Sequence, residues 1–151
     1  MANSEHLRQI QQGVESWNRW RKDDLSRPEL QQADLSEAQL SRVNLQEADL
    51  KKIILVDADL SNANLRKADL TDAYLVRVDL SRADLSFANL QGAILIEANL
   101  TETVFKGANL EGAELSNAHV DKTSFVRANL KQANIDDVDM SSADLKRAIL
   151  N

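Results

Sequence analysis

Carboxylates are the residues of this chain with the clearest potential for chemistry. At a spacing of 20 residues, Asp49 would stack below Asp69 and Asp59 below Asp79, as a carboxylate column. Carboxyl groups that lie close together can bind a cation or shift one another's pKa. The bases Lys51, Lys52, Lys67 and Arg82 stand among them. Turn residues neutralised by neighbouring bases explain this pattern without an ion, so we expect neither a metal site nor a cofactor.

The remaining reactive residue types form no catalytic constellation. His6 and His119 are far apart in the sequence and have no neighbours at the spacing of a triad or a metal site. The four glycines are scattered and form no phosphate-binding loop, and the chain has no cysteine. We therefore predict no catalytic residues and no enzymatic activity.

Composition and charge exclude further classes of function. The formal net charge is −6, and residues 1–30 are balanced, so the excess lies in residues 31–151. A surface of that sign repels nucleic acid, and we expect no direct nucleic-acid binding. No apolar run reaches the length of a membrane span, and the first residues lack the pattern of a signal peptide. We expect a cytoplasmic protein that does not bind membranes.

The dominant pattern is a repeat of five residues. A large apolar residue, usually leucine, occupies every fifth position from Leu30 to Leu150. A small residue, usually alanine, stands two positions earlier, and Asp or Asn lies between the two. Leucines five residues apart would spread around a helix and would alternate between the faces of a strand. The period is satisfied if the chain turns a corner every five residues, so that four corners close a square coil.

These tandem Ala-(Asp/Asn)-Leu-x-x units resemble the pentapeptide repeat family over residues 31–150, which is 24 repeats or six coils of 20 residues. The resemblance implies an all-β solenoid, a right-handed quadrilateral parallel β-helix, and the handedness comes from the family alone. We divide the chain into a helical cap and linker, residues 1–30, and the β-helix, residues 31–151. Folded at a period of 20, the sequence stacks Phe105 on Phe125, with the exceptional small partners Thr103 and Thr123 beside them.

The N-terminal segment predicts a cap, because an open solenoid end exposes core and unpaired backbone. Residues 4–22 have apolar residues at helical spacing and predict one amphipathic helix, with Ser4 as N-cap and Gly13 as a weak point. The residues expected to cover the first coil are Leu7, Ile10, Val14, Trp17 and Trp20. The alternative is a helix that docks on a membrane or a partner, and acidic residues beside its basic cluster oppose the membrane.

No comparable cap sequence follows the last coil. The repeats continue to Ile149 and Leu150, and an uncovered coil is an edge liability. We expect self-association there, as in family members that dimerise through C-terminal coils. The alternative is that a further segment covers the coil.

One side of the square predicts an interaction surface. On the side of Leu55, Leu75 and Leu95, the outward positions before and after each leucine are all apolar. They are Ile54, Val56, Tyr74, Val76, Ile94 and Ile96. The corresponding positions in the flanking coils are polar. The patch is a candidate site for an unidentified protein partner or a second copy; the alternatives are a helix folded over it or a simple preference for strand formers.

We therefore expect a non-enzymatic binding or structural module whose specific role the sequence does not name. The alternative function is a DNA mimic that modulates a type II topoisomerase, as the resemblance implies for some family members. The modest charge, the interleaved bases and the absence of loop insertions count against mimicry.

Overall fold

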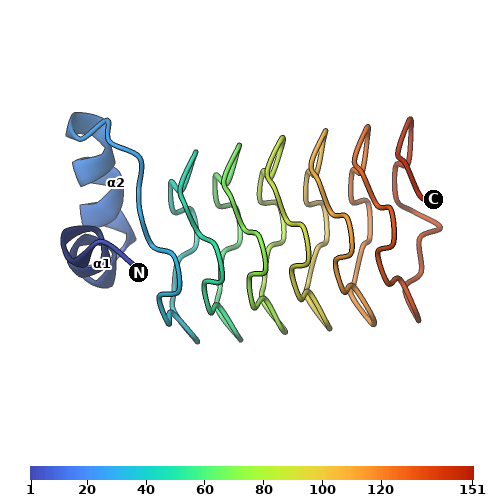
Figure 1. Ribbon diagram of the computed structural model, residues 1–151, viewed down its shortest axis with the longest axis horizontal. Helices are drawn as coiled ribbons and strands as arrows, with labels where there is room; N and C mark the ends of the chain where they lie inside the picture. The colour runs from blue at the N-terminus through green and yellow to red at the C-terminus, as the bar shows by residue number, and fades with distance from the viewer.

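The computed structural model describes residues 1–151, which form two helices followed by a regular solenoid (Figure 1). The helices are α1 (Ser4–Gln11) and α2 (Val14–Asp23). The rest of the chain winds into stacked square coils. Each side of a coil is so short that it contributes a single β-bridge to the next coil, always parallel and twenty residues further along. The pairing begins at Glu29, slightly before the boundary drawn from the sequence.

The four sides are named here by the outward residues that precede the leucines. Side A runs through Ile54, Tyr74 and Ile94; side B through Asp59, Asp79 and Asn99; side C through Asn64, Asp84 and Val104; side D through Asp69, Asn89 and Asn109. The chain visits them in the order A, B, C, D. Sides A and C are therefore opposite faces of the solenoid, and the corner between C and D does not border side A.

Each corner is a hydrogen-bonded turn, and most corners with Asp or Asn before the leucine add a side-chain clamp. In the turn after Leu60, the backbone N–H of Ala63 donates to the carbonyl of Leu60 at 3.1 Å. The third residue, Asn62, has a φ of 59°, as in a type II turn. The carboxylate of Asp59 accepts the N–H of Ser61 at 2.8 Å. This contact explains the Asp or Asn of the repeat, because its side chain stabilises the corner from outside.

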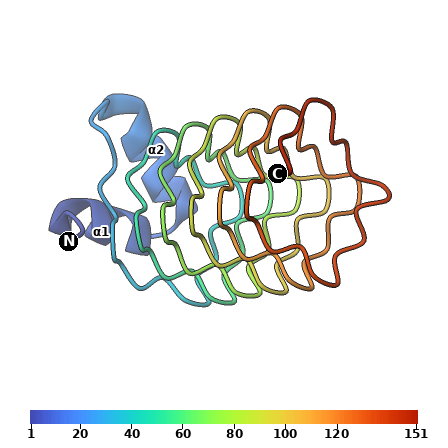
Figure 2. The ribbon, with the colours of Figure 1, turned by 45° about the vertical axis from the view of Figure 1, so that its right-hand side comes forward.

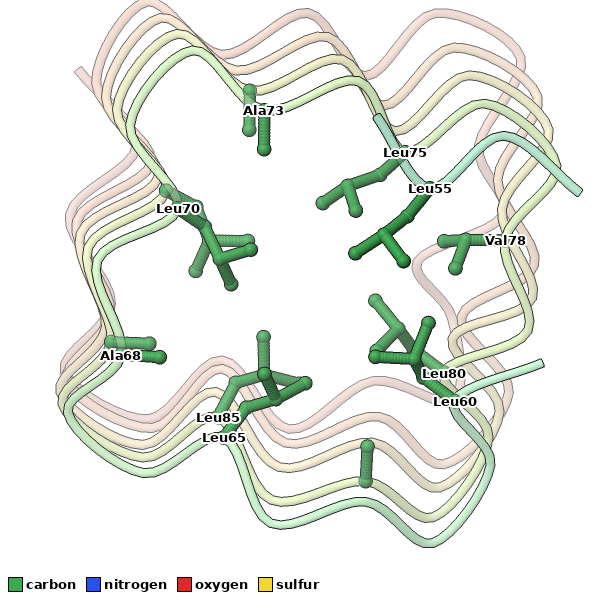
Figure 3. Packing of buried hydrophobic residues seen from close by; sticks show 14 of the residues in the cluster. Leu55, Leu60, Leu65, Ala68, Leu70, Ala73, Leu75, Val78, Leu80 and Leu85 are labelled. Atoms are coloured by element: carbon green, nitrogen blue, oxygen red, sulfur yellow. The ribbon is translucent and has the colours of Figure 1, made fainter. Parts of the chain in front are cut away.

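The interior is a narrow column of leucines and small residues (Figure 3). Leucines from all four sides point inward and lie above their counterparts in the next coil, as Leu55 lies beside Leu75. The rings of Phe105 and Phe125 stack as expected, with centroids 5.3 Å apart and planes within 3°. Thr103 is fully buried beside them, and its hydroxyl donates to the carbonyl of Leu80 at 2.8 Å. That hydrogen bond offsets the burial of a polar group in an apolar core.

The cap consists of two helices, so the prediction of a single helix over residues 4–22 is wrong. The break falls at Gly13, whose φ of 106° suits glycine alone, and α2 begins at the next residue. The predicted N-cap is also wrong. Ser4 is the first helical residue, and the Asn3 side chain accepts the N–H groups of Glu5 and His6. Asn3 provides the capping acceptor one residue earlier because its side-chain oxygen reaches the first turn.

Both helices lie across the first coil and complete its hydrogen bonding. Trp17 is fully buried, and its indole N–H donates to the carbonyl of Asn44 at 2.7 Å. The Asn18 amide donates to the carbonyl of Arg42 and accepts the N–H of Asn44. On side D, the His6 Nδ1 accepts the N–H of Glu29 at 2.9 Å. These side chains replace the strand that a preceding coil would supply.

The last coil is less regular than the repeat predicts. The bridges of side B end at His119, because no pairing joins it to Asp139. Ser142 lacks the positive φ found at the equivalent corner of other coils, and its hydroxyl instead accepts the N–H of Lys122. In Figure 2 the last coil swings outward. With no further coil to pair with, this segment gains less from the regular turn, which requires a left-handed residue.

Candidate functional site

Side A carries the apolar patch, defined as Ile54, Val56, Tyr74, Val76, Ile94 and Ile96. Parallel bridges join Ile54 to Tyr74 and Tyr74 to Ile94, so the patch spans three successive coils. The flanking leucines Leu55 and Leu75 point into the core, which turns the patch residues outward (Figure 3). The structure thus brings all six predicted residues together on one face.

The patch side chains are accessible to a partner. Tyr74 is 45% exposed, and the other five residues are partly exposed. Neither helix covers them, because α1 and α2 lie at the end of the solenoid and bond to the first coil on sides C and D. The alternative in which a helix folds over the patch therefore does not occur in this structure.

Polar residues bound the patch at both ends of side A. Below it, the Ser36 hydroxyl and backbone N–H donate to Asp34, and these hydrogen bonds hold the pKa of the Asp34 carboxyl below its ordinary value. Above it, Glu114 accepts a hydrogen bond from the Asn134 amide. The change from apolar to polar occurs within one coil, which makes the patch a bounded feature rather than a property of the whole side.

A column of charged residues borders the patch along the corner with side B. Arg77 donates two hydrogen bonds of 2.7 Å to the carboxylate of Asp57. They hold the pKa of the Asp57 carboxyl below its ordinary value and raise that of the Arg77 guanidinium. Glu97 continues the column in the next coil. The patch therefore has an ordered and mainly acidic border.

Asp49 and Asp69 of the predicted carboxylate column do stack, but the side chain of Lys51 lies between their carboxylates. A bridge joins Asp49 to Asp69, and the Lys51 ammonium lies 3.9 Å from the first carboxylate and 3.4 Å from the second. Burial raises the pKa of Asp69, but hydrogen bonds from Thr71 and the charge of Lys51 outweigh it and leave that pKa lowered. The column therefore acts as a neutralised turn cluster. No group of three or more His, Cys, Asp or Glu side chains is arranged to hold a metal ion.

The irregular last coil leaves a polar hollow of about 800 Å³ beside it. Its lining includes Glu97, His119, Asp121, Asp137 and Asp139. The sequence did not predict this hollow, because the repeat continues through it without an insertion. Its acidic lining and open shape offer neither a nucleophile with a base nor an enclosed pocket.

The end of the solenoid exposes one inward leucine and the outward apolar residue before it. Ile149 is 46% exposed and Leu150 is 44% exposed, whereas the equivalent Leu130 is buried. These two predicted self-association residues lie together at one edge of the last coil. The five predicted cap residues lie at the other end, where Ile10 and Trp17 join the core and Leu7, Val14 and Trp20 pack against it.

Some contact-forming residues were missed from the sequence. His6 and Asn18 bond to the first coil, yet neither belongs to the apolar pattern that identified the cap. Phe87 is 51% exposed at a corner of side C and also went unnoticed. It is the one aromatic residue in its column, and Gly107 follows it one coil later. That combination was visible in the repeat alignment and marks the position as unusual.

Comparison with known proteins places the chain among repeat proteins of this shape. A family model described as pentapeptide repeats matches residues 24–55, 53–86, 83–121 and 113–151, with eight copies. No curated protein matches the sequence significantly. The coils form a right-handed quadrilateral β-helix, as the resemblance implied. No helix is long and apolar enough to cross a bilayer.

Several solved structures are similar to this chain. The pentapeptide repeat protein Rfr23 from the cyanobacterium Cyanothece 51142 is 25% identical, with 89% of this chain and 97% of that chain covered and a TM-score of 0.38. HetL from the cyanobacterium Nostoc sp. strain PCC 7120, described as involved in heterocyst differentiation regulation, is 23% identical, with 99% and 95% covered and a TM-score of 0.35. The fluoroquinolone resistance protein QnrB1 is 16% identical, with 78% and 72% covered and a TM-score of 0.38.

Proposed function

This chain belongs to the pentapeptide repeat family, and on that premise we propose that it is a non-enzymatic protein-binding module whose contact surface is the apolar patch. The observation that supports the proposal most directly is the cluster of six outward apolar side chains on side A, with Tyr74 45% exposed and no helix over it. Solvent exposure of clustered apolar side chains is unfavourable, and a bounded exposed cluster often marks an interaction site.

The dimensions of the patch fit a compact contact. Three coils place its outer rows roughly 10 Å apart at the usual strand spacing, so the area is on the order of a few hundred Å². The repeat provides rigidity, because bridges join Ile54, Tyr74 and Ile94 to the coils on both sides. The carbonyls of Val56, Val76 and Ile96 each accept an N–H from the preceding coil. A rigid patch loses little conformational entropy on binding. Arg77 neutralises Asp57 at the border, whereas Glu97 forms no ion pair there and favours a partner with a basic residue beside its apolar centre.

A second copy of this chain is a further candidate partner, through either the apolar patch or the last coil. Leu150 is an inward residue exposed where another coil would cover it, and Ile149 is an exposed apolar residue at the outward position beside it. Two last coils that meet end to end would bury both pairs and give a closed symmetric dimer. We propose this end as the homodimer contact if the chain self-associates independently of the patch.

The alternative, a DNA mimic acting on a type II topoisomerase, has weaker support. A mimic must present carboxylates where DNA presents phosphates, but Lys51, Arg66 and Arg77 each pair with aspartates of the solenoid. The similarity to QnrB1 is at 16% identity and concerns the fold. Micromolar protein that inhibits or protects a topoisomerase in a supercoiling assay would establish mimicry and displace the binding-module proposal.

The experiment places two charges in the patch, as Ile54→Glu with Ile94→Glu. A matched control adds two carboxylates at exposed positions elsewhere, as Gln91→Glu with Gln132→Glu. We expect the first pair to abolish partner capture or self-association and the control pair to preserve it, with both folded by circular dichroism. Sedimentation distinguishes the two possible homodimer contacts. If the Ile54→Glu with Ile94→Glu variant still forms a dimer, that dimer uses the last coil. Unchanged partners and unchanged oligomeric state in the folded patch variant would refute the proposal.

A further inference from the structure

The corner between sides C and D carries a basic ridge that runs along the solenoid. The first and second corner residues of five successive coils contain six bases, no acid, one aromatic residue and three small or apolar residues. They are Arg66, Lys67, Ser86, Phe87, Lys106, Gly107, Val126, Arg127, Lys146 and Arg147. The chain as a whole has a net charge of −6. The only acid at this corner is Glu47, one coil before the ridge begins, and the ridge is opposite in sign to the molecule that carries it.

Half of the ridge charges have no counter-ion within the protein. Arg66 pairs with Asp84 of side C at 3.0 Å, the Lys67 ammonium lies 3.7 Å from Glu47 at the same corner of the preceding coil, and the Lys146 ammonium lies 3.9 Å from Asp144. Lys106, Arg127 and Arg147 form no ion pair. Successive coils lie about 4.8 Å apart, so these cations repel one another. A bound anionic group would relieve that repulsion.

Phe87 gives the ridge an apolar centre. It is 51% exposed, and its φ of 61° is uncommon for a bulky residue. Its ring lies against the backbone of Gly107, where an added Cβ would come within 2.8 Å of two ring atoms. The Arg66 guanidinium lies 6.0 Å from the ring centroid on the other side. The ring is thus supported by the wall of the solenoid while half of it faces solvent.

We propose that the basic ridge binds an acidic protein segment that carries an apolar side chain among its carboxylates. The carboxylates pair with Lys106, Arg127 and Arg147, and the apolar side chain packs on Phe87. Charge complementarity determines the sign of the partner, and the exposed ring determines the apolar anchor. The ridge lies away from the apolar patch on side A, so this site is independent of the proposed function.

A nucleic acid fits the ridge less well than an acidic segment. The positive strip is one corner wide; Asp84 and Asp144 flank it on side C, Asp69 flanks it on side D, and Glu47 lies at its end. A duplex is far wider than the strip and would place phosphates over these carboxylates. Single strands bind proteins by stacking successive bases on several aromatic rings, and the ridge offers one. An acidic segment needs only a few charges and one anchor.

The test measures binding of two fluorescent synthetic peptides by anisotropy. One consists of glutamates interrupted by leucines, and the other has alanines in place of the leucines. Lys106→Glu with Arg127→Glu should weaken both peptides by roughly tenfold or more, since each exposed ion pair contributes up to about 1 kcal/mol. The control, Lys52→Glu with Lys122→Glu, makes the same charge change at other corners and should alter binding less than about twofold. If the reversed pair fails to fold, Lys106→Gln with Arg127→Gln replaces it.

Phe87→Ala tests the apolar contact separately from the charge attraction. This substitution should weaken binding of the leucine peptide and leave binding of the alanine peptide unchanged. Ile54→Glu with Ile94→Glu should change the binding of neither peptide. Three results would overturn the proposal. They are no peptide binding at low salt, equal losses in the ridge and control variants, and tighter binding of an oligothymidylate than of the leucine peptide. The last result would assign the ridge to single-stranded nucleic acid.

Discussion

Single residues determine how the chain turns its corners. The second corner residue has a φ between 53° and 67° throughout the regular coils, and most of these residues are not glycine. A left-handed conformation is unfavourable for such residues, by roughly 1 kcal/mol each. The Asp or Asn clamp and the turn hydrogen bond offset it, as Asp59 and Ala63 do around Ser61. The turns after Leu55, Leu75 and Leu95 keep the same backbone without a clamp, so the clamp stabilises a corner but is not required for it.

Two glycines with nearly the same φ allow the contact between Phe87 and Gly107 to be measured apart from backbone strain. Gly107 has a φ of 65° and Gly112 a φ of 67°, but a Cβ at Gly112 meets nothing within 4 Å. Gly107→Ala should therefore lower the free energy of unfolding by about 1–2 kcal/mol more than Gly112→Ala, because the ring must move. Urea unfolding measures the difference. The difference should vanish in a Phe87→Ala background; persistence there would show that the ring is not its cause.

Acid should destabilise the protein through its turn carboxylates. Hydrogen bonds from Ser36, Arg77 and Ser141 lower the pKa values of Asp34, Asp57 and Asp139 below the ordinary 3.8. The unfolded chain therefore binds more protons than the folded one in this range. Stability from these groups is complete above about pH 5 and is lost as the pH falls below about 4.

Urea midpoints measured from pH 7 to pH 2.5 test this dependence. Asp57→Asn removes one contributing carboxyl and should make the decline shallower. Glu15→Gln, on the exposed face of α2, is the matched control and should not. A midpoint that does not fall between pH 5 and pH 2.5 would contradict the assignment.

At the scale of elements, side chains of the cap supply the hydrogen bonds that a neighbouring strand would otherwise give to the first coil. Trp17 and Asn18 of α2 satisfy the backbone of Arg42 and Asn44. Trp17→Ala should lower the free energy of unfolding by about 3–5 kcal/mol, because it leaves a cavity and an unpaired carbonyl. Arg19→Ala, at an exposed position of the same helix, should change it by less than about 0.5 kcal/mol. Equal effects would show that α2 does not cap the coil.

Elements were predictable where the repeat constrains them. Each inward leucine repeats the same environment, so the coils, the stacked Phe105 and Phe125 and the grouping of the apolar patch followed from the period of 20. The break at Gly13 was not predictable, because a glycine within an amphipathic pattern is compatible with a continuous helix. The irregular last coil was also not predictable. It depends on the β-bridges that residues 137–142 lack, and not on which amino acids they are. Phe87 was visible but unassigned, because its support by Gly107 requires coordinates.

At the scale of the whole molecule, the solenoid separates three kinds of surface. Side A presents the apolar patch, the corner between C and D presents the basic ridge, and acidic turn residues cover much of the remainder. The core has the same leucine column under all of them. The corners of side A form with Ile54, Tyr74 and Ile94 in place of the clamp residue, so these apolar residues are not required for the fold. This supports the view that the outward residues serve recognition.

The most direct measurement asks whether the apolar patch is buried in the assembled state. The chain has no cysteine, so Tyr74→Cys introduces a single thiol within the patch, and Gln91→Cys provides an exposed reference. Thiol labelling is followed for the isolated protein and for the assembly. We predict that assembly slows labelling at position 74 severalfold and leaves position 91 unchanged, and that Ile54→Glu with Ile94→Glu removes the protection. Equal labelling at both positions in the assembled protein would contradict the proposed contact surface.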